Sequence, residues 1–189
     1  MAVPIEEYAL LSNCRAATLV SREGSMDWLC LPRFDSASLF GAILGDERHG
    51  RWMLRPADPA ARAERAYDGD SFTLRTRWTS AAGVAEVIDV MPCDDDTDIV
   101  RRVRGVSGRV EFEVDLRIRP DYARAMPWMH QVGTEEHPAL VAIAGPDALV
   151  IRGARLHGSL QVETIDITRR VIVVADLGIE IREELEVRR

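Results

Sequence analysis

Apolar and charged residues alternate strictly over residues 110–119, the most regular pattern in the chain. The alternating residues are Val110, Glu111, Phe112, Glu113, Val114, Asp115, Leu116, Arg117, Ile118 and Arg119. Successive side chains of a β-strand point to opposite faces, so an alternation with a period of two predicts a strand. We expect its apolar face to meet a core and its charged face to meet water.

Two further patterns predict β-hairpins earlier in the chain. Apolar residues dominate 16–20 and 26–31, and the Ser-Arg-Glu-Gly-Ser segment between them has the composition of a turn. Apolar and polar residues alternate over 72–78, and Ala-Ala-Gly then turns the chain into a second apolar run over 84–91. Each pair of segments is expected to form two adjacent antiparallel strands.

The rest of the chain consists of short segments that are rich in β-branched residues and bounded by turn residues. Residues 51–55 predict a strand, whereas the Ala-, Arg- and Pro-rich segment 56–66 is typical of a surface connection. Later strands are expected at 140–144, 148–151, 160–167, 171–174 and 179–187. Strands that recur about every 8 to 12 residues favour stacked sheets over a closed barrel. The predicted fold is therefore an all-β, antiparallel two-sheet β-sandwich that forms a single domain over residues 1–189.

Rings, charges and a proline are concentrated in residues 24–40, GSMDWLCLPRFDSASLF. Pro32 has no amide hydrogen, so the strand predicted over 26–31 must end there. The three residues that follow Pro32 are expected on a turn. A short helix is then expected over 36–45, begun by a capping serine and ended by a glycine.

This segment is the candidate functional site of the chain. Trp28 and Phe34 offer flat apolar faces to a sugar ring, and Arg33 and Asp35 can hydrogen-bond its hydroxyl groups. In a structural interpretation both rings are core residues and Arg33 is a buried partner of Asp27 or Asp35. We favour that arrangement for Arg33, because a proline-bounded turn rich in rings usually locks two layers together. The third hypothesis makes Asp27 and Asp35 an acid and base pair for glycoside cleavage, although such aspartates more often accept backbone or arginine hydrogen bonds.

The acidic run 94–98 resembles the start of a calcium-binding loop. Its sixth position is Ile99 where the loop needs glycine, and its twelfth is Gly105 where it needs glutamate. A solvated turn is therefore expected there. The four histidines also lack ligand spacing, so no metal site and no cofactor are predicted.

A second cluster of polar and aromatic residues follows the alternating strand. Its members are Asp121, Tyr122, Pro127, Trp128 and His130. The cluster can rim a pocket, but a loop packed on the end of the sandwich is the simpler prediction. The three cysteines, Cys14, Cys30 and Cys93, lack metal spacing and are predicted to be free buried thiols.

The charge and hydropathy of the chain argue against nucleic-acid binding and against a membrane segment. The chain has 24 Lys and Arg against 31 Asp and Glu, a net charge of −7, and its arginines are interleaved with carboxylates, which argues against a nucleic-acid surface. It has no run of about 18 apolar residues, and Glu6 and Glu7 lie where a signal peptide needs basic residues. We therefore expect no membrane segment and a cytoplasmic location.

Residues 11–52, LSNCRAATLVSREGSMDWLCLPRFDSASLFGAILGDERHGRW, resemble the opening of the bacterial trehalase and glucoamylase-like proteins of glycoside hydrolase family 15. The resemblance continues in order through TRWT at 76–79, VIDVMP at 87–92, RRVRGVSGRV at 101–110, RIRPDY at 117–122, PW at 127–128 and AGPDA at 144–148. It covers roughly the first 150 residues. One departure is that the family's usual Arg-Phe-Asp-Tyr-Gly is Arg-Pro-Asp-Tyr-Ala at 119–123.

The resemblance implies an amino-terminal β-sandwich that packs against a catalytic (α/α)₆ barrel, and the barrel carries the two catalytic glutamates. We expect this barrel to be absent from the chain, so no catalytic residue is assigned. The expected role is to support the barrel of a parent glycoside hydrolase and to line its sugar site through Trp28, Arg33, Phe34 and Asp35. The implied substrate is an α-glucoside such as trehalose.

A sandwich separated from such a barrel would expose apolar surface, so we expect the isolated chain to form a homodimer. The alternative function is a free-standing β-sandwich that binds a carbohydrate or a protein and has no catalytic activity. A long downstream reading frame with helical periodicity would support the first function, and a stop codon after Arg189 would support the second.

Overall fold

The computed structural model of the protein describes residues 3–93, 98–135, 137–145, 147–152, 163–166 and 171–176. Sheet A consists of β1 (Tyr8–Ser12), β2 (Ala17–Ser21), β3 (Ser25–Cys30), β4 (Ser38–Phe40), β5 (Arg51–Pro56), β10 (Glu111–Arg117) and β14 (Glu163–Asp166). Sheet B consists of β6 (Arg62–Tyr67), β7 (Leu74–Ser80), β8 (Gly83–Val90), β9 (Asp98–Gly108), β11 (Trp128–Gly133), β12 (Pro138–Ala144), β13 (Asp147–Arg152) and β15 (Val171–Asp176).

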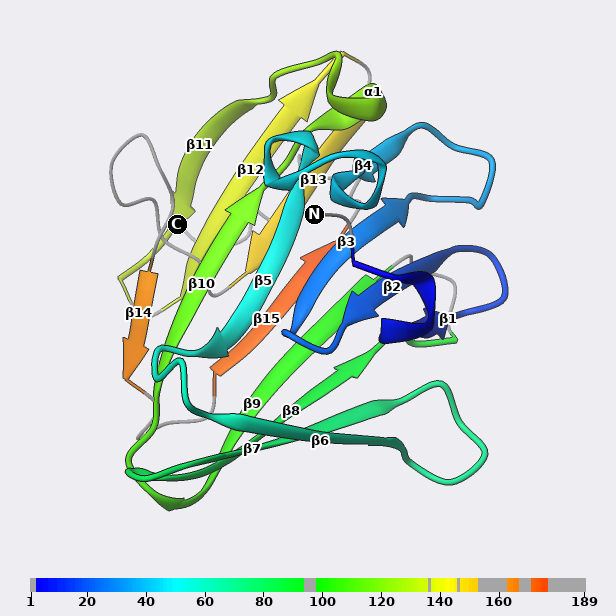
Figure 1. The fold of residues 1–189 in the computed structure, drawn as a ribbon. Helices are drawn as coiled ribbons and strands as arrows, with labels where there is room; N and C mark the ends of the chain where they lie inside the picture. The colour runs from blue at the N-terminus through cyan, green and yellow to red at the C-terminus, as the bar shows by residue number, and fades with distance from the viewer. Residues whose placement is uncertain are drawn as a thin grey trace.

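The two sheets face each other as the layers of a β-sandwich (Figure 1). In sheet A the strand order is β1-β2-β3-β5-β10-β14, with β4 paired to β3, and in sheet B it is β11-β12-β13-β15-β9-β8-β7-β6. The pairings among the described strands are antiparallel. The predicted all-β class and antiparallel sheets are confirmed.

The main core lies between the sheets. One cluster of buried side chains takes members from both layers, including Leu11, Met26 and Trp52 of sheet A and Leu74, Ile99 and Leu140 of sheet B. Burial of this apolar surface is the dominant favourable term in folding and requires both layers together. Each sheet therefore depends on the other for its stability.

Both predicted hairpins are present. In the first, β2 pairs with β3, and a register shift between Leu19 and Val20 marks a bulge. Gly24 in its turn has φ +79°, and a Cβ there would lie 2.4 Å from the carbonyl oxygen of Leu54, so only glycine fits. In the second, β7 pairs with β8, and Leu74, Thr76 and Trp78 are buried as the alternation predicts.

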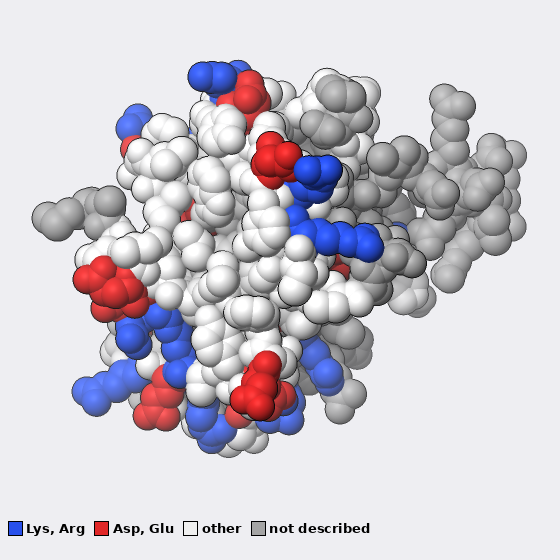
Figure 2. Space-filling model, turned by 90° about the vertical axis from the view of Figure 1, so that its right-hand side faces the viewer, with Lys and Arg blue, Asp and Glu red and all other residues white. Residues whose placement is uncertain are grey.

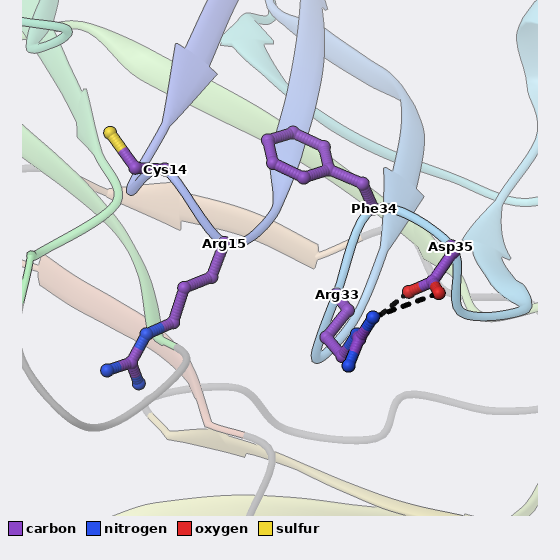
Figure 3. Close-up of a pocket in the computed structure, with 5 residues that line it drawn as sticks. All are labelled: Cys14, Arg15, Arg33, Phe34 and Asp35. Carbon is purple, nitrogen blue, oxygen red and sulfur yellow. Dashed lines mark hydrogen bonds and ion pairs between the residues drawn. The ribbon is translucent and has the colours of Figure 1, made fainter.

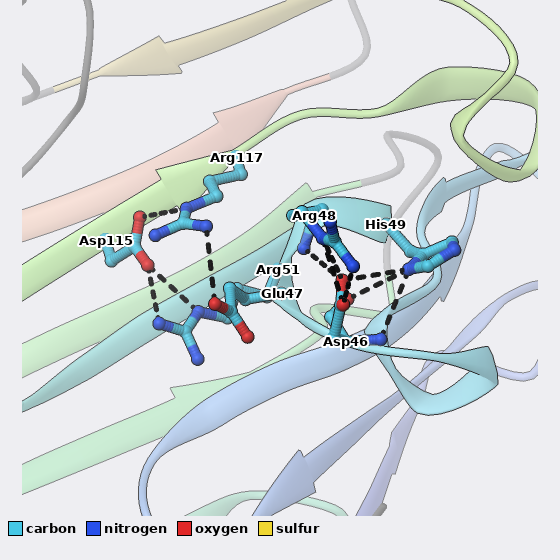
Figure 4. Close-up of polar contacts among 7 residues, drawn as sticks. All are labelled: Asp46, Glu47, Arg48, His49, Arg51, Asp115 and Arg117. Atoms are coloured by element: carbon cyan, nitrogen blue, oxygen red, sulfur yellow. Dashed lines mark hydrogen bonds and ion pairs between the residues drawn. The ribbon is translucent and has the colours of Figure 1, made fainter.

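The alternating strand is β10, and its apolar face packs against the core as predicted, with Phe112 and Leu116 buried and Val114 partly buried. Its other face is not uniformly in water, because Asp115 is buried too. Asp115 accepts hydrogen bonds from Arg51 of β5 at 2.6 and 2.9 Å and from Arg117 at 2.9 Å (Figure 4). Two guanidinium groups lie over the carboxylate and shield it, so this part of the prediction was wrong.

A buried ion pair ties the two sheets together. Arg101 of β9 bonds Asp89 of β8, and both side chains are almost fully enclosed. The guanidinium also donates to the carbonyl oxygens of Trp52, on β5 of sheet A, at 2.6 Å and of Gly24, in the β2–β3 turn, at 2.9 Å. It lies 5.3 Å from the Trp52 ring, in range for a cation–π contact. One side chain of sheet B thus holds β5 and the β2–β3 turn.

Two segments predicted as loops are strands. Residues 62–67 of the expected surface connection form β6, and residues 128–133 of the second aromatic cluster form β11. Among the described strands, β6 pairs with β7 alone and β11 pairs with β12 alone. Both are largely exposed edge strands, so neither needs the alternation of apolar residues that reveals a half-buried strand.

The helix predicted over 36–45 is much shorter than expected. Ser38–Phe40 is β4, and only Ala42–Leu44 forms a 3₁₀ turn, η2. Two further 3₁₀ turns are η1 (Ile5–Glu7) and η3 (Glu47–His49), and the short helical element α1 covers Pro120–Ala123. All three residues of β4 are buried and they pair with β3, so tertiary packing overrides the helical spacing of this segment.

The later strand predictions are confirmed where the chain is described. Strands β12, β13, β14 and β15 lie within or overlap the expected segments 140–144, 148–151, 160–167 and 171–174. The strand expected over 179–187 lies outside the described residues, as do residues 94–97 of the acidic run.

Candidate functional site

The β3–β4 loop carries Arg33, Phe34 and Asp35. The Ser36 amide donates to the Arg33 carbonyl oxygen at 3.1 Å, and the Arg33 amide donates to the Ser36 hydroxyl at 3.2 Å. The Phe34 amide donates to the carbonyl oxygen of Arg15, in the β1–β2 loop, at 3.0 Å. Because the two loops hold each other, the Phe34 ring is kept at the surface, with 58% of the residue exposed.

A surface pocket of about 460 Å³ lies between these two loops (Figure 3). It is lined by Cys14, Arg15, Arg33, Phe34 and Asp35. In Figure 3 the guanidinium of Arg33 points to the carboxylate of Asp35. The pocket therefore offers an apolar ring beside a charged donor and acceptor, the combination that binds a polyhydroxylated ring.

Arg33 and Asp35 form a two-bond pair on the surface. The guanidinium donates to the carboxylate at 2.9 and 3.1 Å, and each side chain is 72% exposed. The prediction that Arg33 is a buried partner was therefore wrong. The hydrogen bonds from Arg33 and its positive charge lower the pKa of the Asp35 carboxyl, so this group is ionised at neutral pH and accepts hydrogen bonds.

Trp28 does not line this pocket. It lies on β3, half-buried, with its ring centroid 6.2 Å from that of Tyr122 at an interplanar angle of 43°. Three of the four predicted binding residues thus line the pocket, and the fourth, Trp28, pairs with Tyr122 away from it. The prediction that Trp28 and Phe34 are both core residues fails for Phe34, which is exposed.

Asp27 has a structural environment. It is 8% exposed and accepts hydrogen bonds from the hydroxyl groups of Tyr8, at 2.8 Å, and Ser25. Burial and the bond to Asp27 raise the pKa of Tyr8. Asp27 is therefore satisfied within the fold, whereas Asp35 is paired with Arg33 at the surface, so the two carboxylates do not form the hypothesised acid and base pair.

Tyr122 is positioned by a left-handed turn. Asp121, Tyr122 and Ala123 have φ values of 52°, 55° and 63°, a conformation that costs about 1–2 kcal/mol per residue for L-amino acids. The Tyr122 amide donates to the buried hydroxyl of Ser38 at 3.0 Å, which helps to hold the turn. Alanine occupies position 123, where the family that this chain resembles usually has glycine.

Sequence reasoning missed Cys14, Arg15 and Tyr122 as neighbours of the predicted residues. A turn signal was present for the first two, since the Asn13 side chain accepts from the amides of Arg15 and Ala16 at 3.0 and 2.9 Å. The asparagine predicts a turn but does not show which other segment the turn contacts.

In the second cluster of polar and aromatic residues, Trp128 and His130 lie edge to face on β11, with ring centroids 3.6 Å apart.

The three cysteines are free, as predicted, but only Cys30 is buried, and Cys14 and Cys93 are exposed. Burial raises the pKa of the Cys30 thiol. Over the described ranges, no three His, Cys, Asp or Glu side chains come together as metal ligands would. The helices of those ranges are too short or too polar to traverse a bilayer.

The amino-acid sequence of this chain is similar to those of known proteins. A family model described as "Trehalase-like, N-terminal" matches residues 1–175. The trehalase of Mycolicibacterium smegmatis is 36% identical over 141 residues, which are 64% of this chain and 21% of that protein. The trehalase of Mycobacterium tuberculosis is 32% identical over 166 residues, 77% of this chain and 24% of that protein.

Trehalase 1 of Sulfolobus acidocaldarius is 38% identical over 110 residues, 58% of this chain and 18% of that protein. The chain therefore spans about a fifth to a quarter of the length of the curated relatives it matches. No solved structure matches it. The match over 175 of 189 residues, together with the β-sandwich, shows that the chain belongs to the trehalase-like N-terminal domain family.

Proposed function

We propose that residues 1–189 are a single amino-terminal β-sandwich domain of a glycoside hydrolase of the trehalase or glucoamylase type. In this proposal the domain supports a catalytic (α/α)₆ barrel, and the parent protein hydrolyses an α-glucoside such as trehalose. The family match and the trehalase relatives support the domain assignment, and they do not favour the free-standing sandwich. The catalytic carboxylates belong to the barrel.

The observation that carries a sugar-facing role is the pocket between the β1–β2 and β3–β4 loops. Phe34 presents an exposed ring there, and the side chains of the Arg33–Asp35 pair beside it are 72% exposed, so their polar atoms can also bind hydroxyl groups. We assign these three residues to one wall of the sugar site. Trp28 adds a second aromatic surface through its pair with Tyr122.

The test is a chimera in which the matching amino-terminal region of the M. smegmatis trehalase is replaced by this chain. Arg33→Ala should lower kcat/KM for trehalose in the chimera, because the wall loses a charged donor. The matched control is Arg48→Ala, since Arg48 forms a similar exposed pair with Asp46 but lies outside the pocket. Equal kinetics for both variants would show that the pocket does not contact substrate.

The isolated chain should hydrolyse neither trehalose nor maltose, because its candidate carboxylates do not form a catalytic pair. Glucose release above a blank with purified protein, lost in Asp35→Asn, would contradict this and return a catalytic role to Asp35.

A further inference from the structure

One end of the sandwich presents a broad uncharged surface. The β1–β2 loop, the β3–β4 loop and the β6–β7 turn lie on the right of Figure 1, and Figure 2 looks onto that side. Most of the centre of this view is free of Lys, Arg, Asp and Glu, and many charged side chains lie toward its margins. Charged residues make up 29% of the chain, so their scarcity here is a property of this surface.

Exposed apolar side chains come from the elements at this end. They are Leu10 at 40%, Phe34 at 58%, Tyr67 at 43%, Phe72 at 47% and Tyr122 at 44% exposed, and we call this set the loop-end face. Leu10 lies on β1, Phe34 on the β3–β4 loop, Tyr67 at the end of β6, Phe72 on the β6–β7 turn and Tyr122 on α1. The set thus extends well beyond the pocket and is too dispersed for one small sugar to cover.

The loop-end face is held in place before any partner binds. The Tyr67 hydroxyl exchanges hydrogen bonds of 2.9 Å with the backbone of Leu10, and the Tyr67 and Phe72 rings meet edge to face at 6.3 Å. Phe34 is tied to the β1–β2 loop, and Tyr122 is tied to Ser38. A preformed surface loses little side-chain entropy on binding, which is a property of docking sites.

We infer that the loop-end face docks the remainder of a trehalase-length protein. Contiguous exposed apolar surface marks interaction sites in soluble proteins. Leu10, Tyr67 and Phe72 form such a surface, because Tyr67 contacts both of the others. The matched region covers only 18–24% of the length of the trehalases that this chain matches, so most of each of those proteins lies outside it. The inference rests on the proposed function and deepens it, because docking at this face places the pocket at the boundary between the two parts.

The test uses the chimera described above and differential scanning calorimetry. In the wild-type chimera the sandwich should unfold together with the rest of the protein. Phe72 lies outside the pocket, and Phe72→Arg puts a charge into the loop-end face. In this variant the sandwich should unfold in a separate transition, at the melting temperature of the isolated variant chain. Leu10→Arg should do the same. The control is Trp128→Arg, because Trp128 is 66% exposed but lies on β11, and it should leave the transitions coupled.

The outcomes separate the inference from the proposed function. Coupled transitions in both face variants would overturn the docking face, and retained trehalose hydrolysis would leave the proposed function standing. A second outcome is that the wild-type chimera unfolds as one unit, the face variants lose this coupling, and the chimera has no trehalase activity. That outcome would support the docking face and contradict the proposed function. Independent unfolding of the wild-type chimera would overturn docking at any face. An isolated chain that sediments as a dimer and becomes a monomer in Phe72→Arg would assign the face to a second copy and overturn our choice of occupant.

Discussion

Two arginine–aspartate pairs in this domain have the same geometry and opposite environments. The Nε to Oδ1 distance is 2.9 Å in both Arg101–Asp89 and Arg33–Asp35. The side chains of the first pair are 0% and 1% exposed, and those of the second are 72% each. Distance alone therefore does not say whether a pair supports the fold or is available to a ligand.

The remaining hydrogen-bonding groups make the difference. Arg101 uses its other N–H groups on two carbonyl oxygens of the opposite sheet, so every direction around it is occupied by the fold. Arg33 donates to Asp35, and the pair is otherwise open to water at the pocket. A buried pair whose three guanidinium nitrogens all donate within the fold fixes the relation of two sheets, whereas an exposed pair contributes little to stability and can exchange water for a ligand.

The largest expected effect is that of Arg101→Met. Removing one partner leaves the Asp89 carboxylate buried without its cation, which costs about 3–5 kcal/mol. The melting temperature of the isolated chain should fall by roughly 10 °C. The double variant Arg101→Met with Asp89→Leu should recover a large part of the loss, because no buried charge is then unpaired. A single variant that melts like wild type would mean that this pair is not a structural tie.

An intermediate effect is expected for Asp115→Ala, because its two partners are only partly buried. Arg51 and Arg117 are 24% and 22% exposed, so water can reach them once the carboxylate is gone. We expect a loss of about 1.5–3 kcal/mol, the range for a hydrogen bond to a charged group. Urea unfolding of the variant beside Arg101→Met measures the rank order, and a larger loss for Asp115→Ala would break the proposed link between burial and cost.

Tyr8→Phe tests the buried aspartate of the opening motif. Asp27 loses a donor, which should cost about 1 kcal/mol at pH 7. The pKa of Tyr8 is raised in the folded state, so its contribution is fully present below the ordinary value of 10.0 and declines as the pH rises above it. The stability gap between wild type and variant should therefore narrow above pH 10. A gap that is constant from pH 7 to 11 would contradict the assigned role of Tyr8.

The smallest stability effect is expected for Arg33→Ala. Surface substitutions of this kind change stability by no more than about 0.5 kcal/mol. The melting curve of the isolated variant should thus coincide with that of the wild type, while the chimera loses activity on trehalose. A clear drop in the melting temperature of Arg33→Ala would contradict this prediction. It would show that the exposed Arg33–Asp35 pair stabilises the fold despite its exposure.

Local sequence patterns predicted those elements whose two faces differ in environment. The alternation over 110–119 and the two hairpins are confirmed as β10 and the β2–β3 and β7–β8 pairs. The edge strands β6 and β11 were missed, because each is largely exposed and packs only a few partly buried residues against the core, so the apolar alternation is weak. The predicted helix over 36–45 gave way largely to β4, since pairing with β3 buries all three of its residues.

By itself the sequence determined the all-β class, the order of most strands, the family and the segment that carries the candidate site. It could not show that Arg101 is buried and Arg33 is exposed, because both arginines have an aspartate within three residues in the sequence. Burial depends on what covers a side chain, and Arg101 is covered by Trp52 and Gly24, 49 and 77 residues away in the chain. Only the stacking of the two sheets brings those groups together and leaves the Arg33 loop at the surface beside the β1–β2 loop, so tertiary contacts decide which arginine is buried and which is exposed.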